Sequence, residues 1–251
     1  GLVGSEMCIR DSYGMPARLD VIRSIADSYG IPILEDSAEA MGSEYKGKKC
    51  GLWGDYGVMS FNGNKMITTS GGGALICPDA ESAARVKFLA TQARENRPYY
   101  YHKVIGYNYR LSNISAAIGC SQMETIDSRI ARRREIHRLY SEGLKDLAGV
   151  TVQKNPSKDF DSNFWLTTVL IDPACGMTPD EIRVALLDRR IESRLLWRPM
   201  HMMPVFEAFP YYGSGVGESL FERGLCLPSG ASLTDEQISV VIEALHDILG
   251  A

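Results

Sequence analysis

An aspartate and a lysine in this chain could form a site for carbonyl chemistry. Asp36 follows a short apolar run at residues 31–34, and Lys65 lies in a polar, glycine-dense stretch at residues 62–73. A lysine amine can hold an aldehyde as a Schiff base, and a carboxylate beside a pyridine nitrogen keeps that nitrogen protonated. Pyridoxal 5'-phosphate is the cofactor that needs both groups. The hydroxyl of Ser60 and nearby backbone N–H groups could bind its phosphate.

Spacing alone leaves a structural interpretation open for each candidate. An aspartate after a strand is more often structural, and a single lysine in a loop is more often an ordinary surface residue. The four arginines within residues 129–134 could clamp a diphosphate, but such a run is more typical of a solvated helix face. His201 could contact a substrate or serve only packing. The tyrosines at residues 99–101 could line a sugar pocket or a subunit interface.

The elements that must position these residues follow from apolar spacing. It predicts a helix over residues 17–29 that ends at Gly30, and then a strand over residues 31–34. Further strands are expected at residues 56–61, 74–77 and 165–171. Helices are expected at residues 79–92 and 178–189, from Thr234 onward and, with few breaks, across residues 112–147. A helix–glycine–strand order is typical of a parallel α/β sheet, in which ligands bind beyond the carboxyl ends of the strands. Asp36 is therefore expected at the edge of the sheet that binds ligands.

Composition describes a soluble globular protein with one large or two modest domains. The chain has 251 residues, of which 45% are hydrophobic and 23% charged. Its 27 basic and 31 acidic side chains give a net charge of −4, so we expect no general attraction to nucleic acid or to a membrane. No apolar run is long enough to span a membrane and no secretory signal is present, which favours a cytoplasmic location. Without any C-x-x-C pair, we expect no metal site, and reduced, mostly buried thiols at Cys8, Cys50, Cys77, Cys120, Cys175 and Cys226.

The first twelve residues differ from the rest of the chain. GLVGSEMCIRDS has no helical or strand period and runs abruptly into a well-patterned sequence. It resembles translated adapter sequence. We therefore expect residues 1–12 to be a non-native leader, and the natural chain to have begun further upstream.

Several motifs together resemble one known family. EDSAEAMGSEYKGKK, SFNGNK, TTSGGGAL, GYNYR and RPMH are similar to the DegT/DnrJ/EryC1/StrS family of nucleotide-sugar aminotransferases, and the resemblance runs from Tyr13 to the end. It implies the α/β fold of type I PLP-dependent transferases, with a mainly parallel sheet. Residues 13–128 would form the C-terminal part of the large cofactor-binding domain, and residues 129–251 a small C-terminal α+β domain.

The resemblance also implies roles for particular residues. Lys65 would be the catalytic Schiff-base lysine, Asp36 the partner of the cofactor's ring nitrogen and Ser60 a phosphate ligand. Glu39 occupies a position where many relatives carry glutamine near the cofactor's ring hydroxyl. Asn108 would reach the phosphate of the neighbouring subunit's cofactor, so the resemblance implies a homodimer with shared active sites when the protein is full length.

Within the family, the motifs most resemble enzymes that aminate C4 of a UDP-linked 4-keto-6-deoxy-N-acetylhexosamine on the route to bacillosamine. The amino donor would be glutamate. Arg198 and His201 are the candidate contacts to the nucleotide sugar. A minority branch has histidine at the position of Lys65 and performs dehydration, so the lysine favours transamination. Two alternatives stay open. The chain could act on another keto sugar nucleotide, of the GDP-perosamine or 3-amino sugar type, or it could be an inactive truncated fragment without cofactor. Because the family's N-terminal part supplies further contacts to the cofactor, the truncated chain itself is expected to be inactive.

Overall fold

The computed structural model describes residues 7–250, and the chain folds into two compact units. The N-terminal unit comprises the chain up to Arg129 together with Ser157–Asn163, and the C-terminal unit comprises Ile130–Pro156 and the chain from Phe164 onward. The division falls within helix α4 (Ile126–Gly143), beside the boundary that the sequence predicts after residue 128. The return of Ser157–Asn163 to the N-terminal unit was not expected.

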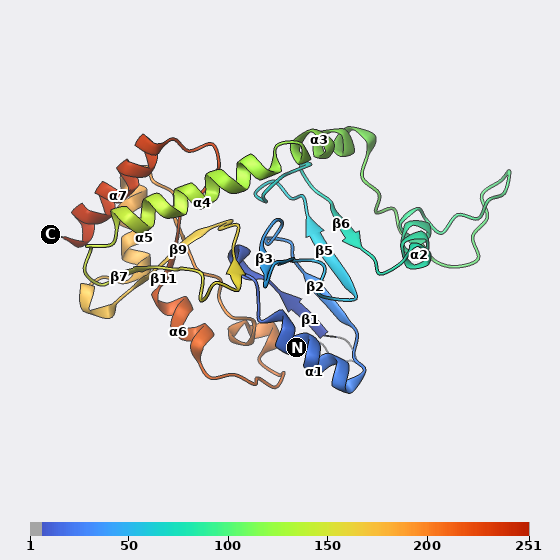
Figure 1. The fold of residues 1–251 in the computed structure, drawn as a ribbon, viewed down its shortest axis with the longest axis horizontal. Coiled ribbons are helices and arrows are strands. Elements are labelled where there is room, and N and C mark those ends of the chain that lie inside the picture. Colours follow the sequence, from blue (N-terminus) through green and yellow to red (C-terminus); the bar gives the residue numbers. More distant parts are fainter. Residues whose placement is uncertain (1–6, 251) are drawn as a thin grey trace. The chain divides into compact units, whose positions relative to one another are not determined.

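A four-stranded sheet organises the N-terminal unit (Figure 1). Its strands are β1 (Met7–Arg10), β2 (Ile33–Asp36), β5 (Tyr56–Ser60) and β6 (Gly73–Ile76), in the order β1-β2-β5-β6. The first three are parallel, and β6 runs antiparallel to β5. The carboxyl ends of β2 and β5 therefore lie at one edge of the sheet. Residues 7–10 of the expected leader form β1, and residues 1–6 lie outside the described residues.

A helix and a small second sheet complete the core of this unit. Helix α1 (Leu19–Tyr29) buries Leu19 and Ala26 against Ile33 of β2. Gly30 ends the helix at φ +64°, a left-handed conformation that glycine adopts without steric cost, and this confirms the predicted helix end. The second sheet pairs β3 (Glu44–Tyr45) with β4 (Lys48–Lys49) on one side and β8 (Phe160–Asp161) on the other.

The long helical pattern expected over residues 112–147, with few breaks, is two helices in the structure. The structure has α3 (Asn113–Met123) and α4 (Ile126–Gly143), separated at Glu124 and Thr125. The Thr125 hydroxyl donates to the carbonyl oxygen of Gln122, and the Thr125 carbonyl oxygen accepts the first bond of α4 from the N–H of Arg129. Threonine that bonds locally in this way offers the backbone an alternative to a continuous helix. The preceding helix α2 (Ala80–Ala90) begins at Asp79, whose side chain accepts from the N–H of Ser82.

The C-terminal unit has an antiparallel sheet covered by helices. Strands β7 (Val150–Val152), β9 (Thr167–Ile171), β10 (Arg194–Leu195) and β11 (Gly224–Leu227) are ordered β10-β11-β9-β7. The helices are α4, α5 (Pro179–Asp188), α6 (Val216–Arg223) and α7 (Asp235–Leu249). Buried side chains of α4, α5 and α7, among them Tyr140, Ile182 and Ile238, pack with Val169 and Leu225 of the sheet. Thr234 begins α7 in a capping box with Gln237, which confirms the predicted start.

Short 3-10 helices fill the connections. They span Ser12–Gly14, Pro173–Cys175, Met200–Met202 and Pro204–Phe206. No helix within residues 7–250 has the length and apolar character needed to cross a membrane. The five cysteines whose side chains are described are free, but the expectation of mostly buried thiols was wrong. Cys50 and Cys226 are buried, Cys77 and Cys175 are half-buried, and Cys120 is exposed.

Candidate active site

Lys65 and Glu39 meet at the carboxyl edge of the N-terminal sheet. Lys65 lies in the loop after β5 and Glu39 in the loop after β2, and Lys65 Nζ is 2.6 Å from Glu39 Oε1. The Lys65 side chain is 12% exposed and the Glu39 side chain 1%. The sequence predicts that both residues belong to one site but not that they pair directly. The loops after two neighbouring parallel strands thus converge where such sheets bind ligands.

The loop of Lys65 is fixed by hydrogen bonds on both sides. The N–H of Thr69 donates to the carbonyl oxygen of Phe61 at 2.9 Å, which closes the loop on itself. Gln122 of α3 accepts from the N–H of Thr68 at 3.1 Å and donates to the Thr68 carbonyl oxygen at 2.9 Å. Sequence reasoning missed Gln122, because a single amide on a helix carries no motif that links it to a loop 54 residues away.

The loop of Glu39 is fixed by a segment from much later in the chain. Asn163, which is fully buried, donates from Nδ2 to the carbonyl oxygens of Glu39 at 2.8 Å and Met41 at 2.9 Å. Its own N–H donates to the hydroxyl of Ser43 at 2.9 Å. Asn163 was also missed, and 124 residues separate it from Glu39. The backbone that carries the Glu39 carboxylate is therefore held in place by tertiary contacts.

Asp36 and Ser60 end the two strands from which these loops leave. Asp36 is half-buried, and its Oδ1 accepts from the N–H of Ala38 at 3.1 Å. Ser60 pairs with Gly73 of β6, so the glycine-dense loop returns to the sheet beside it. An added Cβ at Gly63 or Gly71 would meet no atom within 4 Å. An amine, a carboxylate, a hydroxyl and glycine N–H groups beside open space fit a cofactor that carries an aldehyde, a ring nitrogen and a phosphate.

The neighbour of Asp36 on β2, Glu35, has a different role. Successive side chains of a strand point to opposite faces, and Glu35 is fully buried. Its Oε1 accepts from the N–H of Gly51 at 2.6 Å, and its Oε2 accepts from the N–H groups of Trp53 at 2.8 Å and Gly54 at 3.1 Å. Ser37 donates to Oε1 as well, at 3.0 Å. Glu35 therefore clamps the turn at residues 51–54 to the strand that carries Asp36.

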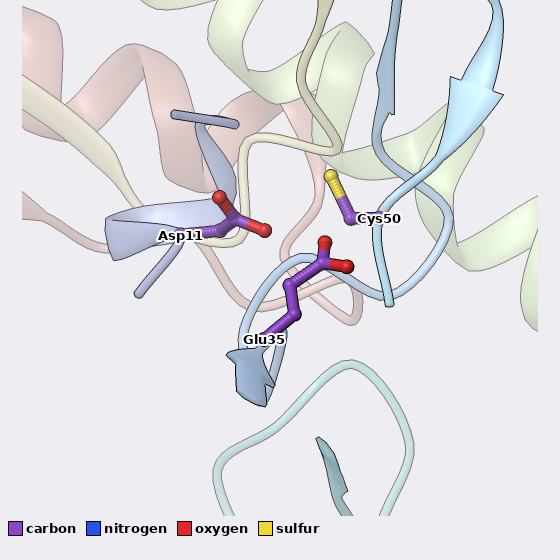
Figure 2. A group of neighbouring side chains, drawn as sticks. All are labelled: Asp11, Glu35 and Cys50. Carbon is purple, nitrogen blue, oxygen red and sulfur yellow. The ribbon is translucent and has the colours of Figure 1, made fainter. Parts of the chain in front are cut away.

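Figure 2 shows Glu35 together with Asp11 and Cys50, three groups close enough to share a metal ion. Hydrogen bonds already account for the two carboxylates, since both oxygens of Glu35 accept backbone N–H groups and Asp11 accepts the N–H of Ala17 at 2.8 Å. Burial raises the pKa of Asp11 to about 6, and it also raises the pKa of the Cys50 thiol. This bonding describes a structural network in the unit's core.

Asn108 lies in an exposed arm at residues 91–112. The arm folds back on α2, because the N–H of Gln92 donates to the carbonyl oxygen of Tyr107 and that of Tyr109 to the carbonyl oxygen of Ala90. Asn108 pairs with Thr91 in an isolated bridge. Its role across a subunit interface stays a prediction, and so does the choice between pocket and interface for the exposed tyrosines of the arm, Tyr99, Tyr100 and Tyr101.

Arg198 and His201 belong to the C-terminal unit. His201 Nε2 is 2.8 Å from Glu218 Oε1, and its ring stacks on Tyr211 with centroids 3.6 Å apart. Hydrogen bonds, chiefly from its own backbone N–H, hold the pKa of the Glu218 carboxyl below its usual range. The Arg198 guanidinium is exposed and lies 6.0 Å from the ring centroid of Phe221. His201 faces a hollow of about 270 Å³ with an aromatic lining, and its contact with a substrate stays a prediction.

The arginine run of α4 is largely structural. Arg133 is buried and donates to the carbonyl oxygen of Trp165. Arg132 pairs with Asp235 at 2.7 Å and donates to the carbonyl oxygen of Leu233 at 2.5 Å. The solvated-face interpretation was therefore wrong for these two residues, because a helix that packs on the C-terminal core turns them inward. Their donors serve this unit's own packing, which leaves the diphosphate clamp without support at both positions.

Comparison with known proteins identifies the family to which this chain is similar. The DegT/DnrJ/EryC1/StrS aminotransferase family matches residues 8–246. The putative pyridoxal phosphate-dependent aminotransferase EpsN of Bacillus subtilis is 45% identical over 93% of this chain and 60% of its own length. GDP-perosamine synthase of Escherichia coli O157:H7 is 39% identical over 96% of this chain and 64% of its own length.

The crystal structure of the aminotransferase TlmJ from Streptoalloteichus hindustanus superposes with a TM-score of 0.88 at 28% identity, over 98% of this chain and 66% of its own. This match shows the type I fold of PLP-dependent transferases that the resemblance implied. The chain spans about three fifths of the length of the curated relatives it matches. Its sequence, its fold and the convergence of Lys65 and Glu39 at the sheet edge agree: the chain belongs to the DegT/DnrJ/EryC1/StrS aminotransferase family.

Proposed function

We propose that the protein is a PLP-dependent aminotransferase that converts a nucleotide-linked 4-keto-6-deoxy sugar into the 4-amino sugar, with glutamate as amino donor. One observation carries the proposal. A lysine amine, Lys65, is fixed beside a buried carboxylate at the ligand-binding edge of a parallel sheet, in a loop held at both sides. A lysine that only solvates a surface needs neither the burial nor the fixed loop.

Each residue of the site has a separate role under this proposal. PLP, when bound, supplies the electron sink for transamination. Lys65 Nζ would bond its aldehyde and, once released by the donor amine, move a proton to and from the reacting carbon. The Asp36 carboxylate would keep the ring nitrogen protonated. Ser60 and the N–H groups of the glycine-dense loop would bind the phosphate, and Asn108 of a second subunit would reach the same phosphate in a homodimer.

The sugar nucleotide is proposed from the motifs and from the relatives. SFNGNK, TTSGGGAL and RPMH favour a UDP-linked N-acetylhexosamine, whereas the name of the Escherichia coli relative states a GDP-linked sugar. Arg198 and His201 are the proposed contacts to this substrate. The amino sugar would serve the synthesis of surface glycans or glycoproteins from a cytoplasmic precursor.

A spectrum and a substrate panel test the proposal. The protein incubated with PLP should show an absorbance band near the visible edge that borohydride removes, because reduction fixes a Schiff base. With glutamate, it should then aminate a UDP-linked 4-keto-6-deoxy sugar faster than the GDP- and dTDP-linked equivalents, as measured by mass spectrometry of the products. Preference for the GDP-linked sugar would favour the perosamine-type alternative. Absence of the band would favour the interpretation as a fragment that binds no cofactor.

A further inference from the structure

A carboxylate on helix α6 holds two aromatic rings in the C-terminal unit. Glu218 lies in the first turn of α6, where a negative charge suits the helix dipole. Its Oε1 lies 2.8 Å from Nε2 of His201, and its Oε2 accepts from the hydroxyl of Tyr211 at 3.3 Å. The two bonded rings are stacked, with centroids 3.6 Å apart and planes inclined by 14°. We call these three side chains the Glu218 clamp.

The backbone between the rings and the helix fits closely around this clamp. Gly213 passes so near to Tyr211 that an added Cβ would collide with the hydroxyl group and the ring. A larger residue at this position would therefore displace the ring that stacks on His201. The plane of the His201 ring is thus set by a hydrogen bond, by stacking and by the course of the loop together.

The clamp decides which ring nitrogen of His201 is left for a ligand. Hydrogen bonds, chiefly from its own backbone N–H, hold the pKa of the Glu218 carboxyl below its usual range, so the group is an acceptor only. Nε2 of His201 must therefore carry the proton of the shared bond, whether the imidazole is neutral or charged. Within residues 7–250, the other ring nitrogen, Nδ1, has no hydrogen-bond partner.

His201 also borders a hollow that is suited to part of a ligand. The hollow measures about 270 Å³, and its mostly aromatic lining includes Phe206, Phe209 and Tyr212. The side chain of His201 is 23% exposed, so a ligand can reach it. Pockets that hold a whole small molecule measure about 300–1,000 Å³ and combine apolar walls with a few orienting polar groups. This hollow has the same lining, with room for one ring of a larger molecule.

We propose that Glu218 is a positioning residue for His201: it holds Nε2 and thereby presents Nδ1 to a hydroxyl group of the nucleotide sugar. A hydroxyl can donate to a neutral imidazole nitrogen and accept from a protonated one, so the contact persists in both charge states. The diphosphate only accepts, and it would be left to the Arg198 guanidinium, which only donates. This inference rests on the proposed function, because that function supplies the nucleotide sugar.

Nuclear magnetic resonance of the ring nitrogens tests the positioning without cofactor or substrate. The chain has four histidines, so a long-range proton–nitrogen correlation spectrum can separate them, and His201→Gln identifies the signals of His201 by their loss. At the alkaline end of a titration, where the ring is neutral, His201 should carry its proton on Nε2. His102 is the internal contrast. Its Nδ1 lies 2.8 Å from the carbonyl oxygen of Gln92, so its proton should be on Nδ1.

Variants of Glu218 separate the clamp from a merely structural contact. Glu218→Gln keeps the size of the side chain, but an amide can either accept from Nε2 or donate to it. We therefore expect the fraction of His201 with a proton on Nε2 to fall from nearly all molecules to about half. Glu218→Asp keeps a group that only accepts and should restore part of the preference. Glu222→Gln makes the same charge change at an exposed residue of α6, and this matched control should leave the His201 signals unchanged.

A second measurement adds a stable analogue of the substrate. UDP-N-acetylglucosamine has the nucleotide and the hydroxyl groups but no keto group, and it should shift the Nδ1 signal of His201. Inorganic pyrophosphate should not shift it. His246, whose Nε2 lies 2.9 Å from the carbonyl oxygen of Gly143, should not respond to either compound. In Glu218→Gln, we expect the dissociation constant of the analogue to rise about fivefold, as for the loss of one well-placed hydrogen bond.

The inference and the proposed function fail separately. An Nε2 proton on His201 that Glu218→Gln changes no more than Glu222→Gln does overturns the positioning role. An Nδ1 signal that UDP-N-acetylglucosamine does not move, or that pyrophosphate moves as much, overturns the contact with a hydroxyl group. A wild-type protein without a borohydride-sensitive band after incubation with PLP overturns the proposed function, whatever the spectra of His201 show.

Discussion

At the scale of single residues, the proposed function depends most on Lys65. Lys65→Arg keeps a cation beside the buried Glu39 carboxylate but cannot form a Schiff base. We expect this variant to fold, to lack the borohydride-sensitive band and to lose turnover by about a thousandfold or more. Lys49→Arg, at an exposed pair of the same unit, is the control and should behave as the wild-type protein. Single-turnover transamination retained by Lys65→Arg would refute the assignment.

Asp36 is expected to act through the electronics of the ring. Asp36→Asn keeps the shape of the side chain and the acceptor for the N–H of Ala38, so the loop should stay in place. An unprotonated pyridine is a poor electron sink, and we expect the variant to bind PLP while its rate falls by a large factor. Absorbance titration measures the binding, and product formation measures the rate. Wild-type rates in Asp36→Asn would mean that another group partners the ring nitrogen.

His137 links stability to pH. It is 9% exposed, its ring stacks on Phe164, and its Nε2 lies 2.6 Å from the carbonyl oxygen of Gln153. Burial lowers the pKa of His137 from 6.5. As the pH falls below 6.5, the unfolded chain therefore binds a proton at His137 before the folded chain does. The stability from the neutral ring is therefore complete above about pH 6.5 and is lost as the pH falls through the folded-state pKa.

Urea unfolding at pH 5.5 and pH 7.5 checks this expectation. The free energy of unfolding of the wild-type protein should be lower at pH 5.5. In His137→Gln, which does not titrate, the difference between the two pH values should be smaller. An equal difference in both proteins would assign the pH dependence to other groups.

At the scale of the elements, Glu35 joins a strand to a turn. Glu35→Gln replaces one acceptor oxygen with an NH2 group, which would face N–H donors such as those of Trp53 and Gly54. A buried donor left without an acceptor costs about 1–3 kcal/mol, so we expect a loss of this size in the free energy of unfolding. Glu44→Gln, whose carboxylate is in an exposed pair, should lose less than about 0.5 kcal/mol. Equal losses in the two variants would show that the clamp adds no stability.

The elements also show what the sequence could and could not predict. Helix α1 and the start of α7 were predictable, because Gly30 and Thr234 are local signals that act through their own backbone neighbours. The break between α3 and α4 was not, since Thr125 is compatible with a helix until its hydroxyl bonds back to Gln122. In the site, chemistry singled out Asp36, Ser60 and Lys65. Asn163 and Gln122 were not predicted, because an amide side chain that bonds a distant backbone segment produces no periodic pattern in the sequence.

At the scale of the whole molecule, the proposed homodimer makes a distinct prediction. If Asn108 completes the site of a neighbouring subunit, Lys65→Arg and Asn108→Ala are each inactive for different reasons. Mixed subunits should then form heterodimers with one sound site. A 1:1 mixture after full exchange should recover about a quarter of the wild-type rate, because half of the dimers are mixed and each has one of two sites. No recovery despite proven exchange would place Asn108 outside its neighbour's site.

The return of Ser157–Asn163 to the N-terminal unit has a consequence for biosynthesis. Strand β8 pairs with β3, and Asn163 donates to the backbone at Glu39 and Met41 across more than 120 residues of chain. A ribosome delivers the chain from its N-terminus, so the loop of Glu39 emerges long before the segment that holds it. The edge of the sheet that carries Lys65 is thus left unfinished until translation has passed residue 163. A nascent chain arrested earlier would present this edge incomplete, without the segment that holds the loop of Glu39.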